Sequence, residues 1–314
     1  MLSRRHIRIK VLQALYEYFQ GKESRGIASG EKNLVQSIHG IYKLYLYELK
    51  TLMDMHRAAE DEVEHRRNKK LQTEEDRNPN LRFVNNRFLV WLGNNRQFSK
   101  LVEKHKVSWG DDRELIRKVF KEFQKSEEYR EYMSAEENSL EADKRIVKIL
   151  YGKYVVHNET LHQLYEDRNM HWADDLDAAQ MMVTKTLKSY KEEHDEDSDL
   201  PDLLKDDSDV EFAETLYRTS IKRSEEYGKM IHEKANNWEM DRIALVDIIL
   251  MKMALAELVS FNEIPVKVSL NEYIELSKEY STPKSGNFIN GILDKLKNEM
   301  TEAGEIRKIG RGLL

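Results

Sequence analysis

The stretch DRIALVDIILMKMALAELVSFNEIPVKVSLNEYIELSKEYSTPKSGNFINGILDKLK, residues 241–297, decides the fold of this chain. Its first part, residues 241–261, is apolar almost all the way round a helix, whereas a helix at a protein surface shows one apolar stripe. We therefore expect neighbouring segments to bury this helix on most of its sides. Asp247, Lys252 and Glu257 interrupt it, and no apolar run approaches the ~18 residues that indicate a membrane span.

Two further helices are predicted in the same stretch. The residues NEIP at 262–265 stop the first helix. Ser269 and Glu272 then have the spacing of a capping box, which predicts that a second helix starts there and carries LNEYIELSKEY. A break at residues 281–286 precedes a third helix, NFINGILDKLKNEM, which Ser285 is placed to cap.

These blocks resemble a known family. AEL at 256–258, IPVKVSLNEYIELSKEYS at 264–281 and KSGNFINGILDKL at 284–296 are similar, in order and spacing, to the C-terminal half of the NusB transcription antitermination family. The segment VLQALY at 11–16 is similar to the family's V-Q-A-L-Y, with Leu12 as one substituted residue. The resemblance does not cover the middle of the chain. It implies an all-α fold, a helical bundle of NusB type interrupted by a large all-helical insertion.

Composition supports a helical, charge-rich protein. Among 314 residues there are only 4 prolines and 13 glycines, which favours long helices over many short strands. The chain has no cysteine, which excludes disulfides, a thiol nucleophile and thiolate metal sites and fits a cytoplasmic location. The net charge of −6 argues against a uniformly basic surface, so any nucleic-acid site must be a local patch.

The residues 3–20 predict a first helix, with Ser3 as its N-cap and Gly21 as its stop. One face is apolar, and the opposite face is polar: His6, Lys10, Gln13 and Glu17. Arg4 and Arg8 fall on the apolar side, with Arg5 just beyond, where an anionic partner could meet them. On the residues alone, a flexible basic N-terminus with solvated charges is the favoured interpretation, because such charge clusters are common.

The middle of the chain is periodic and helical. Apolar residues recur every three or four positions from Leu34 to Val63, and shorter helices are predicted at 83–101, 111–123, 135–168 and 172–187. Residues 191–211 hold eleven acidic residues and two lysines, which predicts an exposed connector. We therefore predict a family core at 1–23 and 206–300, a helical insertion at 24–205 and a flexible basic tail at 301–314. The role of the insertion stays open.

The resemblance implies an RNA site with two parts. In the NusB family an arginine-rich segment before V-Q-A-L-Y contacts RNA, and by position this role falls to Arg4, Arg5, Arg8 and, more weakly, Lys10. The residues themselves indicate the second part, the turn before the last helix, because a helix N-terminus offers N–H groups and a positive dipole end to a phosphate.

This turn contributes Lys284, Ser285, Asn287 and Phe288 to the predicted site. Lys284 adds charge, and Phe288 either stacks on an unstacked base or belongs to the core. Asn287 stands where family members often carry lysine, which removes one charge. Asn290 and Gly291 fit a structural role, since glycine within a helix is tolerated where another helix comes close.

The predicted function is that of a non-catalytic RNA-binding factor. No phosphate-binding glycine loop, zinc-protease motif or serine-hydrolase motif is present, so no enzyme, cofactor or metal is expected. The resemblance implies a partner, the ribosomal protein NusE, with which the chain would bind the boxA element of ribosomal RNA transcripts in the RNA polymerase antitermination complex. A homodimer is also open, and no membrane is involved. The main alternative is a helical protein–protein adaptor without RNA binding.

Overall fold

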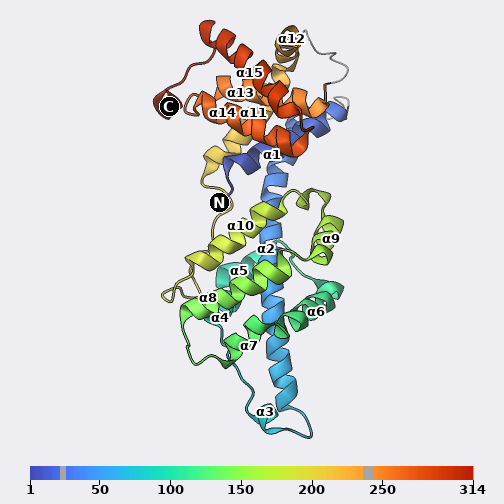
Figure 1. The fold of residues 1–314 in the computed structure, drawn as a ribbon, viewed down its shortest axis with the longest axis vertical. Coiled ribbons are helices and arrows are strands. Elements are labelled where there is room, and N and C mark those ends of the chain that lie inside the picture. The colour runs from blue at the N-terminus through green and yellow to red at the C-terminus, as the bar shows by residue number, and fades with distance from the viewer. Residues whose placement is uncertain (22–25, 236–242, 314) are drawn as a thin grey trace. The chain divides into compact units, whose positions relative to one another are not determined.

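The computed structural model describes residues 1–21, 26–235 and 243–313, and every regular element within these ranges is helical (Figure 1). The predicted all-α class is therefore confirmed. The chain forms two compact units. We call residues 2–38 with 204–314 the terminal unit, and residues 39–203 with Met1 the middle unit. The division at residues 24, 206 and 301 that the sequence suggests stays a prediction.

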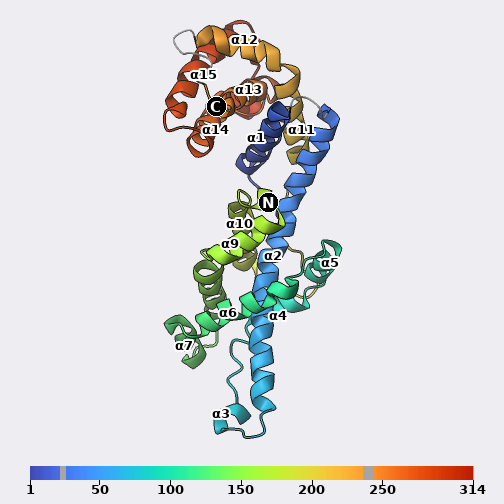
Figure 2. The same cartoon turned by 90° about the vertical axis from the view of Figure 1, so that its right-hand side faces the viewer.

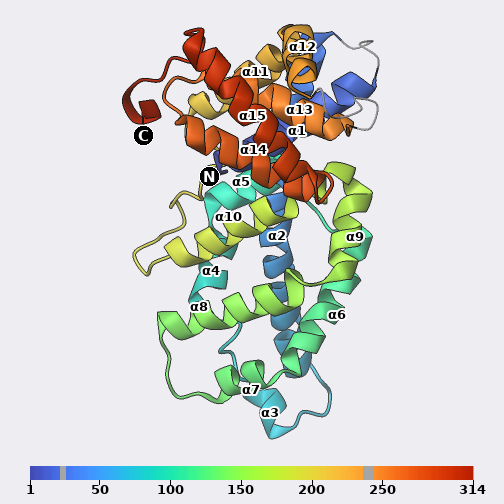
Figure 3. The same cartoon turned by 45° about the horizontal axis from the view of Figure 1, so that its top comes forward.

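Helix α13 is the centre of the terminal unit. Five helices pack against it, α14 and α15 among them (Figure 3): α1 (Arg4–Gln20), α11 (Asp207–Lys222), α12 (Ser224–Lys234), α14 (Val266–Tyr280) and α15 (Ser285–Glu302). α13 itself spans Leu245–Ser260, and most of its side chains from Ile249 to Leu258 are fully buried. This confirms the predicted burial on most sides, while residues 241 and 242 of the predicted helix lie outside the described residues.

The start of α14 differs from the prediction. The helix begins at Val266, directly after Pro265, so Ser269 lies inside it and is buried. The hydroxyl of Ser269 donates a hydrogen bond to Glu257 at 2.7 Å instead of capping the helix. The capping-box prediction was therefore wrong, because the serine serves a partner on another helix.

Part of the segment after α15 contacts the connection between α13 and α14, and the flexibility expected for residues 301–314 stays a prediction. After α15, the backbone N–H of Ile309 donates to the carbonyl of Asn262 at 3.0 Å, and Nζ of Lys308 donates to the carbonyl of Phe261 at 2.9 Å. A short 3-10 helix, η5 (Gly310–Leu313), follows. The tail thus covers the connection between α13 and α14.

Helix α2 (Ile27–Arg67) is the longest element, and shorter helices pack along its length in the middle unit (Figure 2). Its predicted apolar face is confirmed, since Ile41, Tyr45 and Leu52 are buried. The shorter elements are α3 (Glu74–Arg77), α4 (Arg87–Asn94), α5 (Arg96–Lys104), η1 (Gly110–Asp112), α6 (Arg113–Gln124), α7 (Glu127–Ser134), α8 (Leu140–Ile149), η2 (Leu150–Val155), α9 (Glu159–Arg168), η3 (Met170–Trp172) and α10 (Leu176–Ser189).

Asparagine caps divide two segments that the sequence pattern presents as single helices. The side chain of Asn95 accepts from the N–H of Phe98 and starts α5, so residues 83–101 form two helices. The side chain of Asn158 does the same for α9, after a π-helical turn at η2. An asparagine oxygen competes with the helical backbone for these N–H groups, which helical periodicity alone does not register.

Residues 191–203, the acidic segment after α10, belong to the middle unit and contact its helix α5. Leu200 and Leu203 are buried, and Arg96 of α5 forms ion pairs with Glu196 and with Asp197. Exposure, as predicted for this connector, therefore applies to its carboxylates other than the buried Asp209 and not to Leu200 and Leu203.

The core of the middle unit contains a buried acid, Glu48 of α2. Its carboxyl oxygens have no hydrogen-bond partner of good geometry among the described residues. Burial raises the pKa of this carboxyl to about 7, and the nearby hydroxyls of Tyr151 and Tyr165 lower it only in part. The folded chain therefore holds a proton on Glu48 more tightly than the unfolded chain does.

We predict that Glu48→Gln stabilises the protein at alkaline pH only. A raised folded-state pKa means that the stabilising protonated form is fully present below the unfolded pKa and is lost as pH rises through about 7. Near pH 8 the substitution should raise the free energy of unfolding by up to about 3 kcal/mol, and near pH 5 it should change it little. Urea unfolding at both pH values measures this, with Glu64→Gln, an exposed acid on the same helix, as control. Equal effects at both pH values would contradict the prediction.

Candidate nucleic-acid interface

Arg8 of α1 meets its anionic partner inside the protein. Its side chain is 4% exposed, and it donates to both carboxylate oxygens of Glu257 on α13, from Nε at 2.8 Å and from Nη2 at 2.7 Å. Glu272 lies 3.6 Å from the same guanidinium. The sequence suggested that an anionic partner meets this arginine beyond the core, whereas the structure supplies a carboxylate from within the chain.

Both carboxylate oxygens of Glu257 accept hydrogen bonds. Besides Arg8, it accepts hydrogen bonds from the hydroxyls of Ser269 and Tyr273 on α14, both at 2.7 Å. Burial alone would raise the pKa of this carboxyl, but the hydrogen bonds and charge of Arg8 hold the pKa below its ordinary value. The buried pair therefore stays ionised and joins α1, α13 and α14.

Lys10 is buried as well, at 1% exposure, and its Nζ lies 3.3 Å from Oε1 of Gln13. The prediction that Lys10 lies on a solvated polar face was wrong, because α11 and α13 both pack against α1. A helical wheel shows which residues share a side and not how many sides are covered. Its predicted RNA contact stays untested, and the structure gives its ammonium group little access to solvent.

Arg4 and Arg5 are the accessible arginines of this helix. The side chain of Arg4 is 37% exposed, lies 2.9 Å from Asp209 and stacks over the ring of Phe212 at 4.4 Å. The side chain of Arg5 is 35% exposed and lies 3.6 Å from Glu279 in the last turn of α14. The first helix therefore offers two guanidinium groups to solvent, and Arg5 lies close to the turn that follows α14.

Ser285 holds that turn in place. Lys284 occupies the N-cap position of α15 and is exposed, while Ser285 is the first helical residue. Its hydroxyl donates to Asp247 of α13 at 2.7 Å and accepts from the N–H of Thr282 at 3.2 Å. The predicted capping by Ser285 was wrong in detail, but its hydroxyl does fix the turn on the buried helix.

The first turn of α15 presents a mixed surface. Asn287 is exposed and Phe288 is half-buried, so the phenylalanine is neither fully core nor freely displayed. Asn290 and Gly291 are exposed too. A Cβ at Gly291 would meet no atom within 4 Å in the described part of the chain, so the expected close helix approach was wrong there.

The structure thus separates the predicted residues into two layers. Arg8, Lys10 and Ser285 are buried, while Arg4, Arg5, Lys284, Asn287 and Phe288 have access to solvent. The ligands of Arg8 were missed at the sequence level. The signal was present, because a glutamate in an almost wholly apolar helix requires a buried cation or donor to offset its desolvation.

We predict that Arg8→Ala destabilises the protein by about 3–5 kcal/mol, because it leaves the Glu257 carboxylate buried without its cation. Urea unfolding near neutral pH measures this. The control is Arg5→Ala, whose half-exposed pair should contribute less than about 1 kcal/mol. The double variant Arg8→Met with Glu257→Gln should recover much of the loss. Equal effects of Arg8→Ala and Arg5→Ala would disprove the structural role.

None of the helices is long and apolar enough to cross a membrane in the ranges that the structure describes. Within the same ranges, no group of three or more histidine, aspartate or glutamate side chains is arranged to hold a metal ion.

Comparison with known proteins places the chain in a family. A model described as "NusB family" matches residues 174–298. Three curated proteins, each named transcription antitermination protein NusB, are similar. The Salinibacter ruber protein is 46% identical over 112 residues, which is 36% of this chain and 70% of that protein. The Chloroherpeton thalassium protein is 40% identical over 36% of this chain and 54% of its own length, and the Natranaerobius thermophilus protein is 33% identical over 31% and 69%. No solved structure matches. Because the chain covers more than two thirds of the Salinibacter relative at this identity, it belongs to the NusB family.

Proposed function

We propose that this chain is a non-catalytic transcription antitermination factor that binds single-stranded RNA through the α1 N-terminus and the α14–α15 turn. The observation that carries the proposal is the proximity of these two elements. Arg5 of α1 lies beside Glu279, five residues before Lys284, within a chain of the NusB family. Curated relatives bear the name transcription antitermination protein. We further propose that it acts in the cytoplasm.

Arg5 is the strongest candidate for a phosphate contact. Its partner Glu279 is 3.6 Å away and half-exposed, and such surface ion pairs contribute little, so a phosphate replaces it at low cost. Arg4 is bound more firmly, since its partner Asp209 is nearly buried and Phe212 lies under its guanidinium. Lys284 is exposed at the N-terminus of α15, where the helix dipole also favours an anion.

Phe288 and Asn287 supply contacts of another kind. A half-buried ring at the edge of a cationic turn offers a surface on which an unstacked base can lie, the usual way in which single-stranded RNA is recognised. Asn287 is exposed one residue before it and can donate to or accept from a base edge. Arg8, Lys10 and Ser285 then act beneath this surface and keep its parts in register.

The partners follow from the family resemblance. A surface with three exposed cations binds RNA weakly on its own, because phosphate contacts supply most of the affinity. We propose that ribosomal protein NusE completes the surface, and that the two together bind boxA RNA of ribosomal transcripts within the RNA polymerase antitermination complex. The middle unit lies mostly outside the matched residues 174–298, and we propose that it is an insertion into the family core.

A second candidate function is a protein–protein adaptor without RNA binding. The burial of Arg8 and Lys10 favours it, since two of the cations that the sequence offers to RNA serve the fold. The two functions differ in the salt dependence of binding, because only RNA releases condensed counterions when phosphates are neutralised.

We predict that Arg5→Ala and Lys284→Ala each weaken binding of a boxA-type single-stranded RNA and lower the slope of log affinity against log salt by about 0.7. Fluorescence anisotropy with and without NusE, over a range of salt concentrations, measures both effects. The matched control is Lys267→Ala, an exposed lysine at the other end of α14, about 20 Å along that helix from the turn. An equal change in Lys267→Ala, or no binding at low salt with or without NusE, would reject the RNA function.

A further inference from the structure

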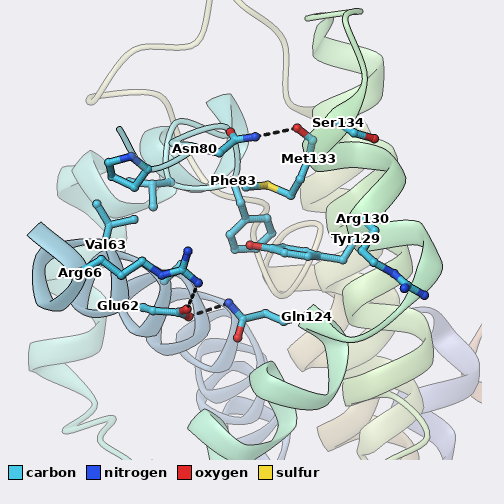
Figure 4. A pocket seen from close by; sticks show the side chains of 13 residues that line it. Glu62, Val63, Arg66, Asn80, Phe83, Gln124, Tyr129, Arg130, Met133 and Ser134 are labelled. Carbon is cyan, nitrogen blue, oxygen red and sulfur yellow. Dashed lines mark hydrogen bonds and ion pairs between the residues drawn. The ribbon is translucent and has the colours of Figure 1, made fainter. Parts of the chain in front are cut away.

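The middle unit contains a pocket that the proposed function does not use (Figure 4). Its volume is about 460 Å³, within the range of sites that hold small ligands or bulky side chains. α2, the segment before α4, and α6 and α7 line it. The apolar part of the lining consists of Ala59, Val63, Pro79, Phe83, Val84 and Met133.

Ordered polar groups surround this apolar lining. Nη2 of Arg66 lies 2.6 Å from one carboxylate oxygen of Glu62, and Nε2 of Gln124 donates to the other at 2.8 Å. On the opposite side, Nδ2 of Asn80 donates to the carbonyl of Met133 at 2.7 Å. Figure 4 shows the two groups on either side of the Phe83 and Tyr129 rings. The pocket is therefore shaped before any ligand arrives, which lowers the entropic cost of binding.

Two exposed cations without an acidic partner among the described residues lie in the run of sequence next to the pocket. The run HRRNKKL at 65–71 ends α2 and continues beyond it, starting from Arg66 at the pocket itself. Lys69 pairs with Asp76, but no ion pair joins Arg67 or Lys70 to an acid within the described residues, and both are exposed. Leu71 at the end of the run is 92% exposed. Glu64 before the run and Glu74 and Glu75 after it are exposed acids that reduce this charge, but none of them forms an ion pair with Arg67 or Lys70 in the described part of the chain.

The lining favours an aliphatic or aromatic side chain over a nucleobase. Base stacking needs an open ring face, yet Phe83 is only 1% exposed, with Phe120 at 5.4 Å and Tyr129 at 5.5 Å from its ring centroid. Apart from the Phe83 and Tyr129 rings, the apolar residues of the lining are non-aromatic, and the exposed Leu71 adds apolar surface outside. An apolar anchor thus fits the pocket, and flanking carboxylates fit the cationic run.

We propose that this pocket and the adjoining run 65–71 form a docking site for an acidic segment of a partner protein, which inserts one bulky apolar side chain between α2 and α7. The site lies outside residues 174–298, the part matched by the NusB family, and adds a protein contact that the RNA surface of the terminal unit does not supply.

The test is a selection of a random peptide library displayed on phage against the full-length chain. Enriched peptides should carry acidic residues around a leucine, isoleucine, phenylalanine or tryptophan. Labelled copies of them should bind about tenfold more weakly to Arg67→Glu with Lys70→Glu, a loss equal to about 1.4 kcal/mol. Val63→Asp should abolish binding, because it places a carboxylate in the pocket. The matched control is Lys100→Glu with Lys104→Glu on α5, exposed cations of the same unit that do not line the pocket.

Thermal unfolding followed by circular dichroism checks that each variant is folded. The exposed charge reversals keep the proposal testable if Val63→Asp does not fold. The proposal is overturned if enriched peptides are neutral or basic, or if they bind the charge-reversed variant and the α5 control equally well. It is also overturned if a single-stranded RNA or a second copy of the chain, rather than acidic peptides, loses binding in these variants. None of these outcomes bears on RNA binding by Arg5 and Lys284, so the two proposals fail separately.

Discussion

The buried ion pair between Arg8 and Glu257 joins parts of the chain that are 249 residues apart in sequence. Removing two charges from water is costly, and the cost is offset only when geometry is good and the remaining lone pairs are satisfied. Here both conditions hold, because the guanidinium is bidentate and Ser269 and Tyr273 fill the other positions of the carboxylate. The first helix therefore has one place and one orientation in the terminal unit.

This constraint also explains how the terminal unit accommodates the long sequence between its two parts. The entropic cost of closing a loop rises only with the logarithm of its length, so a further domain between α1 and α11 adds little once the loop is long. The contacts of α1 with α11 and α13 must offset that cost, and a buried bidentate pair is a specific way to do so. A second buried interaction, the hydrogen bond from the hydroxyl of Ser285 to Asp247, holds the α14–α15 turn against the same central helix, α13. Buried hydrogen bonds thus fix the positions of both parts of the proposed RNA surface, the α1 N-terminus and the α14–α15 turn. Such support from buried groups holds the exposed side chains of a site in a defined geometry.

Much of the fold and part of the site could be predicted from the sequence, and three of the failures share one cause. The all-helical class, the buried α13 and the apolar face of α2 follow from periodicity, which is a local property. Ser269, Ser285 and Lys10 were misassigned because their local spacing fits a cap or a polar face. In the folded chain each is placed by its contacts with another helix. Spacing rules describe what a residue can do for its own helix, and a distant carboxylate or a second covering helix overrides them.

Glu257 and Glu48 are both buried, and the two units offset the cost of burying a carboxyl group in different ways. Glu257 has a cation and two hydroxyl donors, so its pKa is lowered and its contribution to stability is lost as pH falls through that value. Glu48 has no cation, so burial raises its pKa to about 7 and its contribution is lost as pH rises. Acid therefore weakens the terminal unit and alkali weakens the middle unit. These two carboxyls thus make opposite contributions to the pH dependence of stability in the two units.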